Sequence, residues 1–362
     1  MKILYIFLEN EKNIGVRKKI RYQIKALSKL GNEVDKIYVD SDIAYLNDKI
    51  LFKVGGKLLK RFILFFKLKK INLELHDLIY IRNPGSNPFF ISFLKKIKNK
   101  KIIMEIPTYP YDNEANNFFL KVQNMLDKVY RRKLKNYVQR IVTYSDDKEI
   151  WGIPCINISN GIDLGEVAII DKNIKKSINE INFIGVARVA FWHGFDRFIL
   201  SIVEYYKNNP KEIIKFHIVG DGDKETVNNL KKLVKENKLE DYVIFYGYKY
   251  GEELDKIYNK MDIAIGSLGA YRKKVYKSSA LKSREYCGKG IPFVLGEIDI
   301  SFIGCKFIYN VPNDNSLLNI KEIIEWYKNL NMTSEEIRKY AENNLSWDIQ
   351  IKKVVESTKE LI

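Results

Sequence analysis

Cysteine and histidine are scarce in this chain of 362 residues, which contains only three of each. The cysteines, Cys155, Cys287 and Cys305, form no CxxC pair and no even set. This usage does not fit a disulfide scaffold or a cysteine-built zinc site, and it is typical of a reducing compartment. Three scattered histidines do not suggest an imidazole-built metal site. We therefore expect no metal and no organic cofactor.

Long apolar runs are also missing. No stretch of about 18 uncharged apolar residues occurs, which is the length that a bilayer-spanning helix needs. The opening residues MKILYIFLEN hold too short an apolar stretch for the core of a secretion signal, and acidic residues follow at once. We interpret them as a buried first strand and expect a cytoplasmic protein, or one that lies on the inner face of the cell membrane.

Acidic side chains are the minority, with 45 Asp and Glu against 62 Lys and Arg, so the net charge is +17. The excess is concentrated in residues 1–180, which hold 34 basic and 20 acidic residues. Most of the basic residues are lysines, whereas proteins that read nucleic acid rely on arginine for bidentate contacts. Because no recognition motif accompanies this surplus, we do not expect a nucleic-acid partner.

The strongest local charge excess lies in residues 49–73, with eight basic residues and no acid. Within it, GKLLKRFILFFKLKK interleaves leucine and phenylalanine with lysine and arginine, and on a helix these types fall on two faces. That pattern is typical of a helix that lies on an anionic membrane surface. It is equally typical of a core-facing helix with a lysine-rich solvated side, and both interpretations remain open.

The order of elements predicts an α/β protein. An apolar fraction of 46% is enough for a large core, and short apolar runs alternate with amphipathic stretches, which is typical of parallel sheets covered by helices. We predict an N-terminal Rossmann-like domain over 1–168 and a second one over 178–345, joined by a polar linker around 171–180. Residues 346–362 are predicted to form a helix that returns to the first domain. Ligands of such sheets bind beyond the carboxyl ends of the strands, here in the cleft between the two domains.

Three segments of the second half carry candidate chemistry. In GVARVAFWHGFDR, a strand is followed by Arg188 and, five residues later, by His193. In HIVGDGD, a strand ends in Gly220-Asp221-Gly222, where glycines permit close approach of the backbone. In SSALKSREYCGKGIPFV, small residues precede a helix whose amide end is suited to a phosphate, and Glu285 lies about one turn into it, suited to ribose hydroxyls.

In this order and at these separations, the segments resemble the nucleotide-sugar half of glycosyltransferase family 4, retaining enzymes of the GT-B fold. The resemblance implies that Arg188 and His193 hold the donor diphosphate and that Glu285, with Gly290 and Pro292 after it, binds the ribose. It also assigns further donor-binding positions along these segments and in the first helix: Gly15, Gly220, Asp221, Ala280, Leu281 and Lys282. The segment NGID at 160–163 and the terminal SWDIQIKKVVES fit the same family pattern, so the likeness covers most of the chain.

The sequence departs from the family at two positions. Lys277 stands where the family carries the first glutamate of its two-glutamate motif, the residue that contacts the transferred sugar. His193 replaces the usual diphosphate lysine and is neutral for much of the time at pH 7. Lys277, Lys282 or Arg197 would have to supply the missing positive charge, and Lys277 leaves it open whether activity is lost or altered.

The first half is expected to hold the acceptor. In MEIPTYPYDNE, Glu105 ends a strand and is a candidate catalytic residue, and Tyr109, Tyr111 and Asp112 lie in an aromatic loop suited to a sugar ring. Arg82 ends another strand and is a candidate for a phosphate contact. A proline-rich turn with Glu105 as a helix cap explains the same residues equally well.

The resemblance implies transfer of a hexosyl group from a nucleotide-diphosphate sugar, such as a UDP-sugar, to a saccharide or lipid-linked acceptor in bacterial polysaccharide or capsule synthesis. Arg188 is then the leading catalytic candidate, with Lys277 a weaker one, because the departing diphosphate must be stabilised by positive charge. Two alternatives stay open: a non-catalytic partner subunit with the glycosyltransferase fold, and a nucleotide-sugar 2-epimerase.

Overall fold

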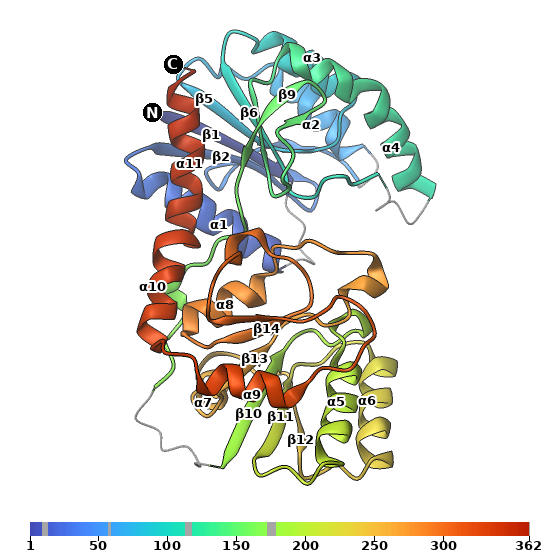
Figure 1. Ribbon diagram of the computed structural model, residues 1–362. Helices are drawn as coiled ribbons and strands as arrows, with labels where there is room; N and C mark the ends of the chain where they lie inside the picture. The colour runs from blue at the N-terminus through green and yellow to red at the C-terminus, as the bar shows by residue number, and fades with distance from the viewer. Residues whose placement is uncertain (9–13, 57–58, 113–117, 172–178, 362) are drawn as a thin grey trace. The chain divides into compact units, whose positions relative to one another are not determined.

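The chain folds into two compact units, residues 1–159 with 347–362 and residues 160–346. The computed structural model describes residues 1–8, 14–56, 59–112, 118–171 and 179–361 (Figure 1). Most of the expected linker at 171–180 lies outside the described residues. No helix of the described ranges is long and apolar enough to cross a membrane.

The first unit is built on a nine-stranded sheet within the described residues, in the order β4-β3-β2-β1-β5-β6-β7-β9-β8. Its strands are β1 (Lys2–Leu8), β2 (Glu33–Asp40), β3 (Ile43–Leu46), β4 (Lys49–Lys53), β5 (Leu78–Arg82), β6 (Lys101–Ile106), β7 (Arg140–Thr143), β8 (Glu149–Ile150) and β9 (Ile153–Asn157). Its helices are α1 (Ile14–Lys29), α2 (Lys60–Leu68), α3 (Pro88–Lys96), α4 (Phe118–Tyr130) and α11 (Trp347–Lys359).

Helices cover both faces of this sheet, as its sequence pattern requires. Along β1, Leu4 and Ile6 pack into a core that α2 and α3 complete, whereas Ile3 and Tyr5 pack into a second core under α1 and α11. A parallel strand buried on both faces is a continuous apolar run, which is why KILYIF indicates a strand. Figure 1 shows α11 beside α1, and the two helices are in contact. The terminal helix therefore returns to the first unit, which confirms the predicted fold class.

The edge of this sheet differs from the prediction. β3 and β4 pair antiparallel beside β2, so the basic residues Lys49 and Lys53 lie in an edge strand. The following helix α2 buries Leu64, Phe65 and Leu68 in the core on one face of the sheet. The interpretation of this segment as a core-facing helix is therefore correct for the face of α2 that carries Leu64, Phe65 and Leu68. Lysines on an edge strand also discourage pairing with other chains.

The second unit contains a six-stranded, all-parallel sheet within the described residues, in the order β12-β11-β10-β13-β14-β15. Its strands are β10 (Glu180–Val186), β11 (Ile213–Val219), β12 (Val243–Gly247), β13 (Ile263–Ile265), β14 (Phe293–Leu295) and β15 (Ile308–Asn310). Its helices are α5 (Phe195–Tyr206), α6 (Lys224–Glu236), α7 (Gly251–Tyr258), α8 (Leu281–Lys289), α9 (Ile320–Lys328) and α10 (Ser334–Asn344).

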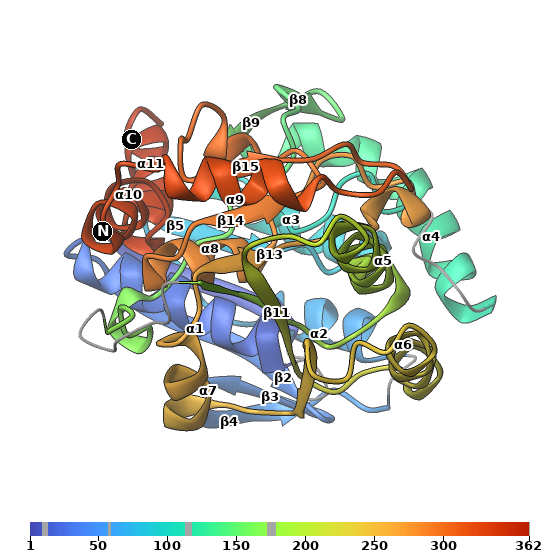
Figure 2. The ribbon, with the colours of Figure 1, turned by 60° about the horizontal axis from the view of Figure 1, so that its bottom comes forward.

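Neighbouring residues of β10 again face opposite cores. Phe183 packs with side chains of α5 and α9, and Ile184 packs with side chains of α8 and α10. The helices α5 and α6 lie side by side in Figures 1 and 2 and contact each other. This arrangement brings the loops after β10, β11 and β14 to the carboxyl edge of the sheet, where the candidate motifs of the second half lie.

Candidate donor site and acceptor unit

The loops after β10 and β11 are joined through their backbones. The Val189 amide donates to the carbonyl of Asp221, and the Asp223 amide donates to the carbonyl of Val189. Gly220 has a φ of +123°, and a Cβ atom there would lie 1.9 Å from the carbonyl oxygen of Ala187. The close approach that these glycines permit is thus already used by the chain itself. The pairing fixes the loop that carries Arg188.

Arg188 itself is exposed, directly after β10. Its guanidinium forms no ion pair with the carboxylates of the described part of the chain. An arginine that is fixed at its backbone and unpaired at its tip is suited to an anionic ligand. The diphosphate contact of Arg188 stays a prediction.

His193 lies in the short 3₁₀ helix Phe191–His193 and faces a cavity of about 360 Å³. Its Nδ1 accepts a hydrogen bond from the Ala190 amide at 3.1 Å. Burial, together with the charge of Lys282, lowers the pKa of His193 to about 3. The imidazole is therefore neutral at pH 7 and does not supply the charge of the lysine that it replaces in the family pattern.

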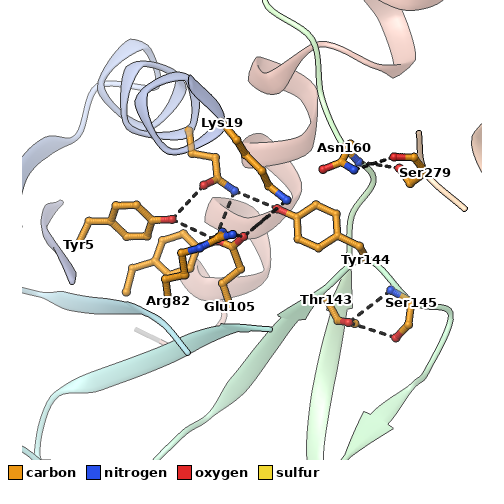
Figure 3. Close-up of polar contacts among 11 residues, drawn as sticks. Tyr5, Lys19, Arg82, Glu105, Thr143, Tyr144, Ser145, Asn160 and Ser279 are labelled. Atoms are coloured by element: carbon orange, nitrogen blue, oxygen red, sulfur yellow. Dashed lines mark hydrogen bonds and ion pairs between the residues drawn. The ribbon is translucent and has the colours of Figure 1, made fainter. Parts of the chain in front are cut away.

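That cavity lies at the start of α8, and all of its lining residues belong to the second unit. Ala280 is the N-terminal cap residue of the helix, and Ser278, Ser279 and Lys282 line the cavity beside it. The first amide groups of a helix lack intrahelical partners and favour anions. The loop before α8 is anchored to the NGID segment, because the Asn160 amide donates to Ser279 Oγ at 2.9 Å (Figure 3).

Of the three cations considered for the missing charge, Lys282 is the one that lines the cavity. Its ammonium nitrogen is buried and has no hydrogen-bond partner among the described residues. Burial lowers the pKa of Lys282 to about 8, an effect that the carboxylate of Glu297 partly opposes. Arg197 is instead buried in the core, where it donates to the carbonyls of Leu268 and Pro312, both at 2.9 Å.

Lys277 and Glu285, the two positions of the family's two-glutamate motif, lie outside this cavity lining. Lys277 is exposed and its backbone forms a parallel bridge with Ile298. Glu285 is half-buried in the second turn of α8, as predicted, and Oε1 accepts a hydrogen bond from the hydroxyl of Tyr258 at 3.2 Å. This bond fixes the rotamer of Glu285.

Sequence reasoning missed the residues that anchor α8. Arg284 is completely buried, and its guanidinium forms a two-pronged ion pair with Asp299 and donates to Ser301 Oγ at 2.9 Å. Its Nε also donates to the carbonyl of Asn160 at 3.1 Å. A buried arginine next to Glu285 in the sequence gives no signal of its partners, which lie beyond β14.

In the first unit, Glu105 is the centre of a buried polar cluster (Figure 3). One carboxylate oxygen accepts from Arg82 at 2.5 Å and from the Tyr144 hydroxyl at 3.0 Å, and the other accepts from the Tyr5 hydroxyl at 2.9 Å. Lys19 completes the cluster, with Nζ at 3.9 Å from Glu105. Arg82 and Glu105 thus form an ion pair with each other. Their predicted roles toward substrate stay predictions, and the geometry suits a carboxylate that orients Arg82 and Lys19.

The cluster also perturbs its charged members. Burial lowers the pKa of Lys19 to about 7, although Glu105 opposes this shift. Burial raises the pKa of Glu105, but the opposing charges of Arg82 and Lys19 prevail and keep its pKa below the ordinary value. Lys19 Nζ also lies 3.4 Å from the centroid of the Tyr144 ring, which stabilises the ammonium form.

The aromatic loop after β6 packs around Trp151. The rings of Tyr109 and Tyr111 each meet the indole edge-on, with centroids 6.0 Å apart in both pairs. Of the three acceptor candidates in this loop, Tyr111 lines a cavity of about 300 Å³, and Tyr109 and Asp112 lie outside the lining of that cavity. Its hydroxyl donates to the carboxylate of Asp127 at 2.6 Å.

The same cavity offers polar groups that the sequence did not reveal. Arg61 of α2 and Asn83, which follows β5, line it together with Asp127. The Arg61 guanidinium donates to Gln123 Oε1 at 3.1 Å, so at least one basic residue of α2 is directed toward a cavity of the unit.

The two remaining candidates of this unit lie outside that cavity lining. Asp112 forms a bidentate ion pair with Arg131, at 2.6 and 3.1 Å. Gly15, the predicted donor contact of this unit, is exposed in the first turn of α1. Their roles toward substrate stay predictions.

Two Rossmann-like units in one chain, with a terminal helix that returns to the first of them, define the GT-B fold. Three solved structures share it over nearly the full length. A glycosyltransferase from Rickettsia africae ESF-5 is 16% identical, with a TM-score of 0.67 and coverage of 99% of this chain and 98% of that one. A sucrose-phosphate synthase from Thermosynechococcus elongatus is 13% identical, with a TM-score of 0.66 and the same coverage. Anabaena HepE in complex with UDP-glucose is 13% identical, with a TM-score of 0.59 and coverage of 99% and 100%.

A likeness to a known family is found at the level of sequence as well. Residues 168–268 match the family Glycosyl transferases group 1. The predicted GT-B fold is thereby confirmed, and the predicted resemblance is confirmed over residues 168–268. No curated protein sequence matches the chain.

Proposed function

We propose that this protein is a retaining glycosyltransferase that moves a hexosyl group from a nucleotide-diphosphate sugar to a saccharide or lipid-linked acceptor. The observation that carries the proposal is the cavity at the start of α8, which contains the unpartnered ammonium of Lys282, a group without a hydrogen-bond partner among the described residues. Its volume of about 360 Å³ falls in the range of small-molecule sites. The solved structure of HepE with UDP-glucose, which has the same fold, supports a donor of this class.

The chemical task is to stabilise a nucleoside diphosphate as it leaves the sugar. Negative charge grows on the phosphate oxygens while the anomeric carbon becomes electron-poor. Lys282, Arg188 and the amides of the first turn of α8 offer fixed positive charge and donors toward that charge. Glu285, held by Tyr258, accepts hydrogen bonds from the ribose hydroxyls. His193 is neutral and shapes the cavity wall without contributing charge.

The acceptor is assigned to the cavity of the first unit. Tyr111 offers an aromatic face, and Asp127, which is buried and accepts from the Tyr111 hydroxyl, gives a carboxylate beside it. Arg61 and Asn83 add donors in the same cavity. An aromatic face with a carboxylate is suited to a sugar, and Arg61 is suited to a phosphate of a lipid-linked acceptor.

A non-catalytic subunit with this fold is the second candidate, and Lys277 is the observation that favours it. A cation at the first position of the two-glutamate motif cannot accept hydrogen bonds from the hydroxyls of a transferred sugar. Such a subunit would bind neither free nor sugar-linked nucleotide in a productive way.

A 2-epimerase with the same fold is distinguished from a transferase by conversion of the donor without any acceptor.

A panel of nucleotide sugars tests the function. UDP, GDP, ADP and dTDP sugars are each incubated with the protein, and thermal shift and release of the free nucleotide are measured. The proposal predicts a rise in melting temperature and slow hydrolysis with at least one donor. A panel without either response contradicts a transferase, and isomerisation of the sugar with no release identifies an epimerase.

A membrane-surface role is also proposed, through a patch that we call the phenylalanine patch, formed by Phe62 and Phe66 of α2 and Phe89 of α3. The Phe89 ring makes edge contacts with both others, at 5.8 and 5.9 Å between centroids. Phe66 and Phe89 are exposed to 49% and 38%. The two helices carry lysines in their last turns, so this part of the unit combines apolar side chains with positive charge, which anionic lipid attracts.

The variant Phe66→Ser/Phe89→Ser tests this role in co-sedimentation with phosphatidylglycerol vesicles. Removal of two half-exposed rings should weaken binding about tenfold. Leu30→Ser is the matched control, because Leu30 is exposed to 37% just after α1, which covers the other face of the sheet. Equal binding of both variants, or equal binding of the wild type to neutral vesicles, contradicts the role.

A further inference from the structure

Glu297 is a buried carboxylate with one oxygen that nothing in the described part of the protein satisfies. It follows β14 in the chain, is only 3% exposed and lines the cavity at the start of α8. Its Oε1 accepts a hydrogen bond from Ser278 Oγ at 3.1 Å, whereas Oε2 is buried without a partner. Burial raises the pKa of this carboxyl, although the charge of Lys282 opposes the shift.

An unpartnered buried acceptor is costly, because the desolvation of the group is not repaid by a hydrogen bond. The same cavity holds a buried donor, the ammonium of Lys282, which likewise has no hydrogen-bond partner among the described residues. A carboxylate and an ammonium of this kind, in a cavity large enough for a small molecule, are suited to a ligand with hydroxyls and negative charge. A phosphate is repelled by Glu297 and attracted by Lys282, so the two groups serve different parts of that ligand.

We propose that Glu297 Oε2 accepts a hydrogen bond from a hydroxyl of the sugar being transferred, while Lys282 holds the adjacent diphosphate. Glu297 thereby selects the sugar in place of the first glutamate of the two-glutamate motif, whose position is occupied by Lys277. This inference rests on the proposed function, because it needs a nucleotide-sugar donor in the cavity.

The backbone explains how the carboxylate comes from a different segment. Residues 276–278 pair with Ile298 like two short parallel strands, and the Ser278 amide donates to the carbonyl of Ile298 at 2.9 Å. Paired strands lie about 5 Å apart. The backbone of Glu297 therefore lies beside position 277, the first position of the two-glutamate motif. Lys277 is exposed at that pairing, whereas Glu297 lies on the cavity wall. The substitution at position 277 therefore leaves a carboxylate available from the neighbouring strand.

The test compares free and sugar-linked nucleotides by titration calorimetry. Wild type and Glu297→Gln are titrated with UDP and UDP-glucose, GDP and GDP-mannose, and dTDP and dTDP-glucose. Glutamine keeps the size of the side chain but loses the charge that strengthens a bond to a hydroxyl. The ratio of Kd for the free nucleotide to Kd for the sugar nucleotide measures how much the sugar adds to binding. For the pair that the wild type binds, we expect this ratio to be at least tenfold lower in Glu297→Gln than in the wild type. The Kd of the free nucleotide should change less than threefold. Glu240→Gln, at an exposed position of the same unit, is the matched control.

A second measurement separates a ligand contact from a structural role. Lys282→Met/Glu297→Gln removes both groups, and its melting temperature without ligand should rise by about 2 °C. Lys256→Met/Glu240→Gln, which changes exposed residues only, controls for the change of charge type. A fall in melting temperature below that control overturns the inference, because it shows that the pair holds the fold together.

The remaining outcomes separate this inference from the proposed function. An unchanged ratio in Glu297→Gln, with nucleotide binding intact, overturns the role of Glu297 alone. A wild type that binds none of the six compounds and responds to no donor of the nucleotide-sugar panel overturns the proposed function, and the role of Glu297 with it.

Discussion

Replacing Lys282 by methionine removes the buried ammonium from the cavity at the start of α8 and keeps most of the volume of the side chain. The nitrogen has no hydrogen-bond partner among the described residues, so no internal hydrogen bond is broken. A hydrogen bond to a charged group contributes about 1.5–3 kcal/mol. The dissociation constant for a nucleoside diphosphate should therefore increase about 10- to 150-fold.

The same ammonium predicts a pH dependence of binding. Since the pKa of Lys282 is about 8, against 10.5 for an ordinary lysine, the free protein loses this proton as the pH rises through 8. Affinity for a nucleotide sugar should then fall as pH increases from 7 to 9, with a slope of log affinity that approaches −1. The other polar groups facing the cavity are His193, which is neutral throughout this range, and Lys273, Glu297 and the serines of the wall.

The assay is calorimetry with a nucleotide sugar, whose diester phosphates do not titrate in this range. Wild type and Lys282→Met are measured at pH 7, 8 and 9, with Lys256→Met as the exposed control. Stability should show the opposite sign. Between pH 8 and 10.5 the unfolded chain binds more protons at this site, so the Lys282 contribution to the free energy of unfolding rises with pH. Wild-type affinity that is flat with pH, or the same slope in Lys282→Met, would refute the assignment.

Two arginines of the second unit should behave differently. Arg188→Ala removes an exposed guanidinium that has no ion pair among the described residues. It should lower the transfer rate about 100-fold, which is the loss typical of one fixed donor toward a developing oxyanion, and leave the melting temperature unchanged. Unchanged turnover contradicts the diphosphate role. Arg284→Met leaves Asp299 buried without its partner and should lower the free energy of unfolding by about 3–5 kcal/mol in denaturant titrations. A loss below about 1 kcal/mol would contradict the anchoring of α8 by this pair.

The sequence predicts the parallel core of the fold well, because its signals are local. KILYIF and INFIGVA indicate strands from their apolar runs alone, and they form β1 and β10. The stop of α1 near Gly31 follows from the left-handed backbone that glycine adopts there, with a φ of +79°. The edge strands β3 and β4 are short, and only one of their residues is fully buried, so their pairing depends on contacts across the sheet that no local pattern reveals.

The candidate donor motifs are also recognisable, because each follows a strand and has a fixed spacing. The residues that contact these motifs are not recognisable from the sequence. Glu297 and Asp299 reach α8 from the segment after β14, and their importance depends on burial, which depends on how β14 packs against β13. Glu297 directly follows the glycine after β14, as Asp221 follows the glycine after β11, so this position alone does not set Glu297 apart. In the first unit, Glu105 likewise ends a strand, but only the structure shows that three tyrosine hydroxyls and Arg82 surround it.

A crystal structure of the protein with UDP-glucose, or with the donor that the panel identifies, tests the central claim most directly. The account predicts phosphate oxygens within hydrogen-bond distance of Lys282 Nζ and of the first amides of α8, with the ribose on Glu285. A nucleotide bound elsewhere, with no phosphate at Lys282, would contradict it.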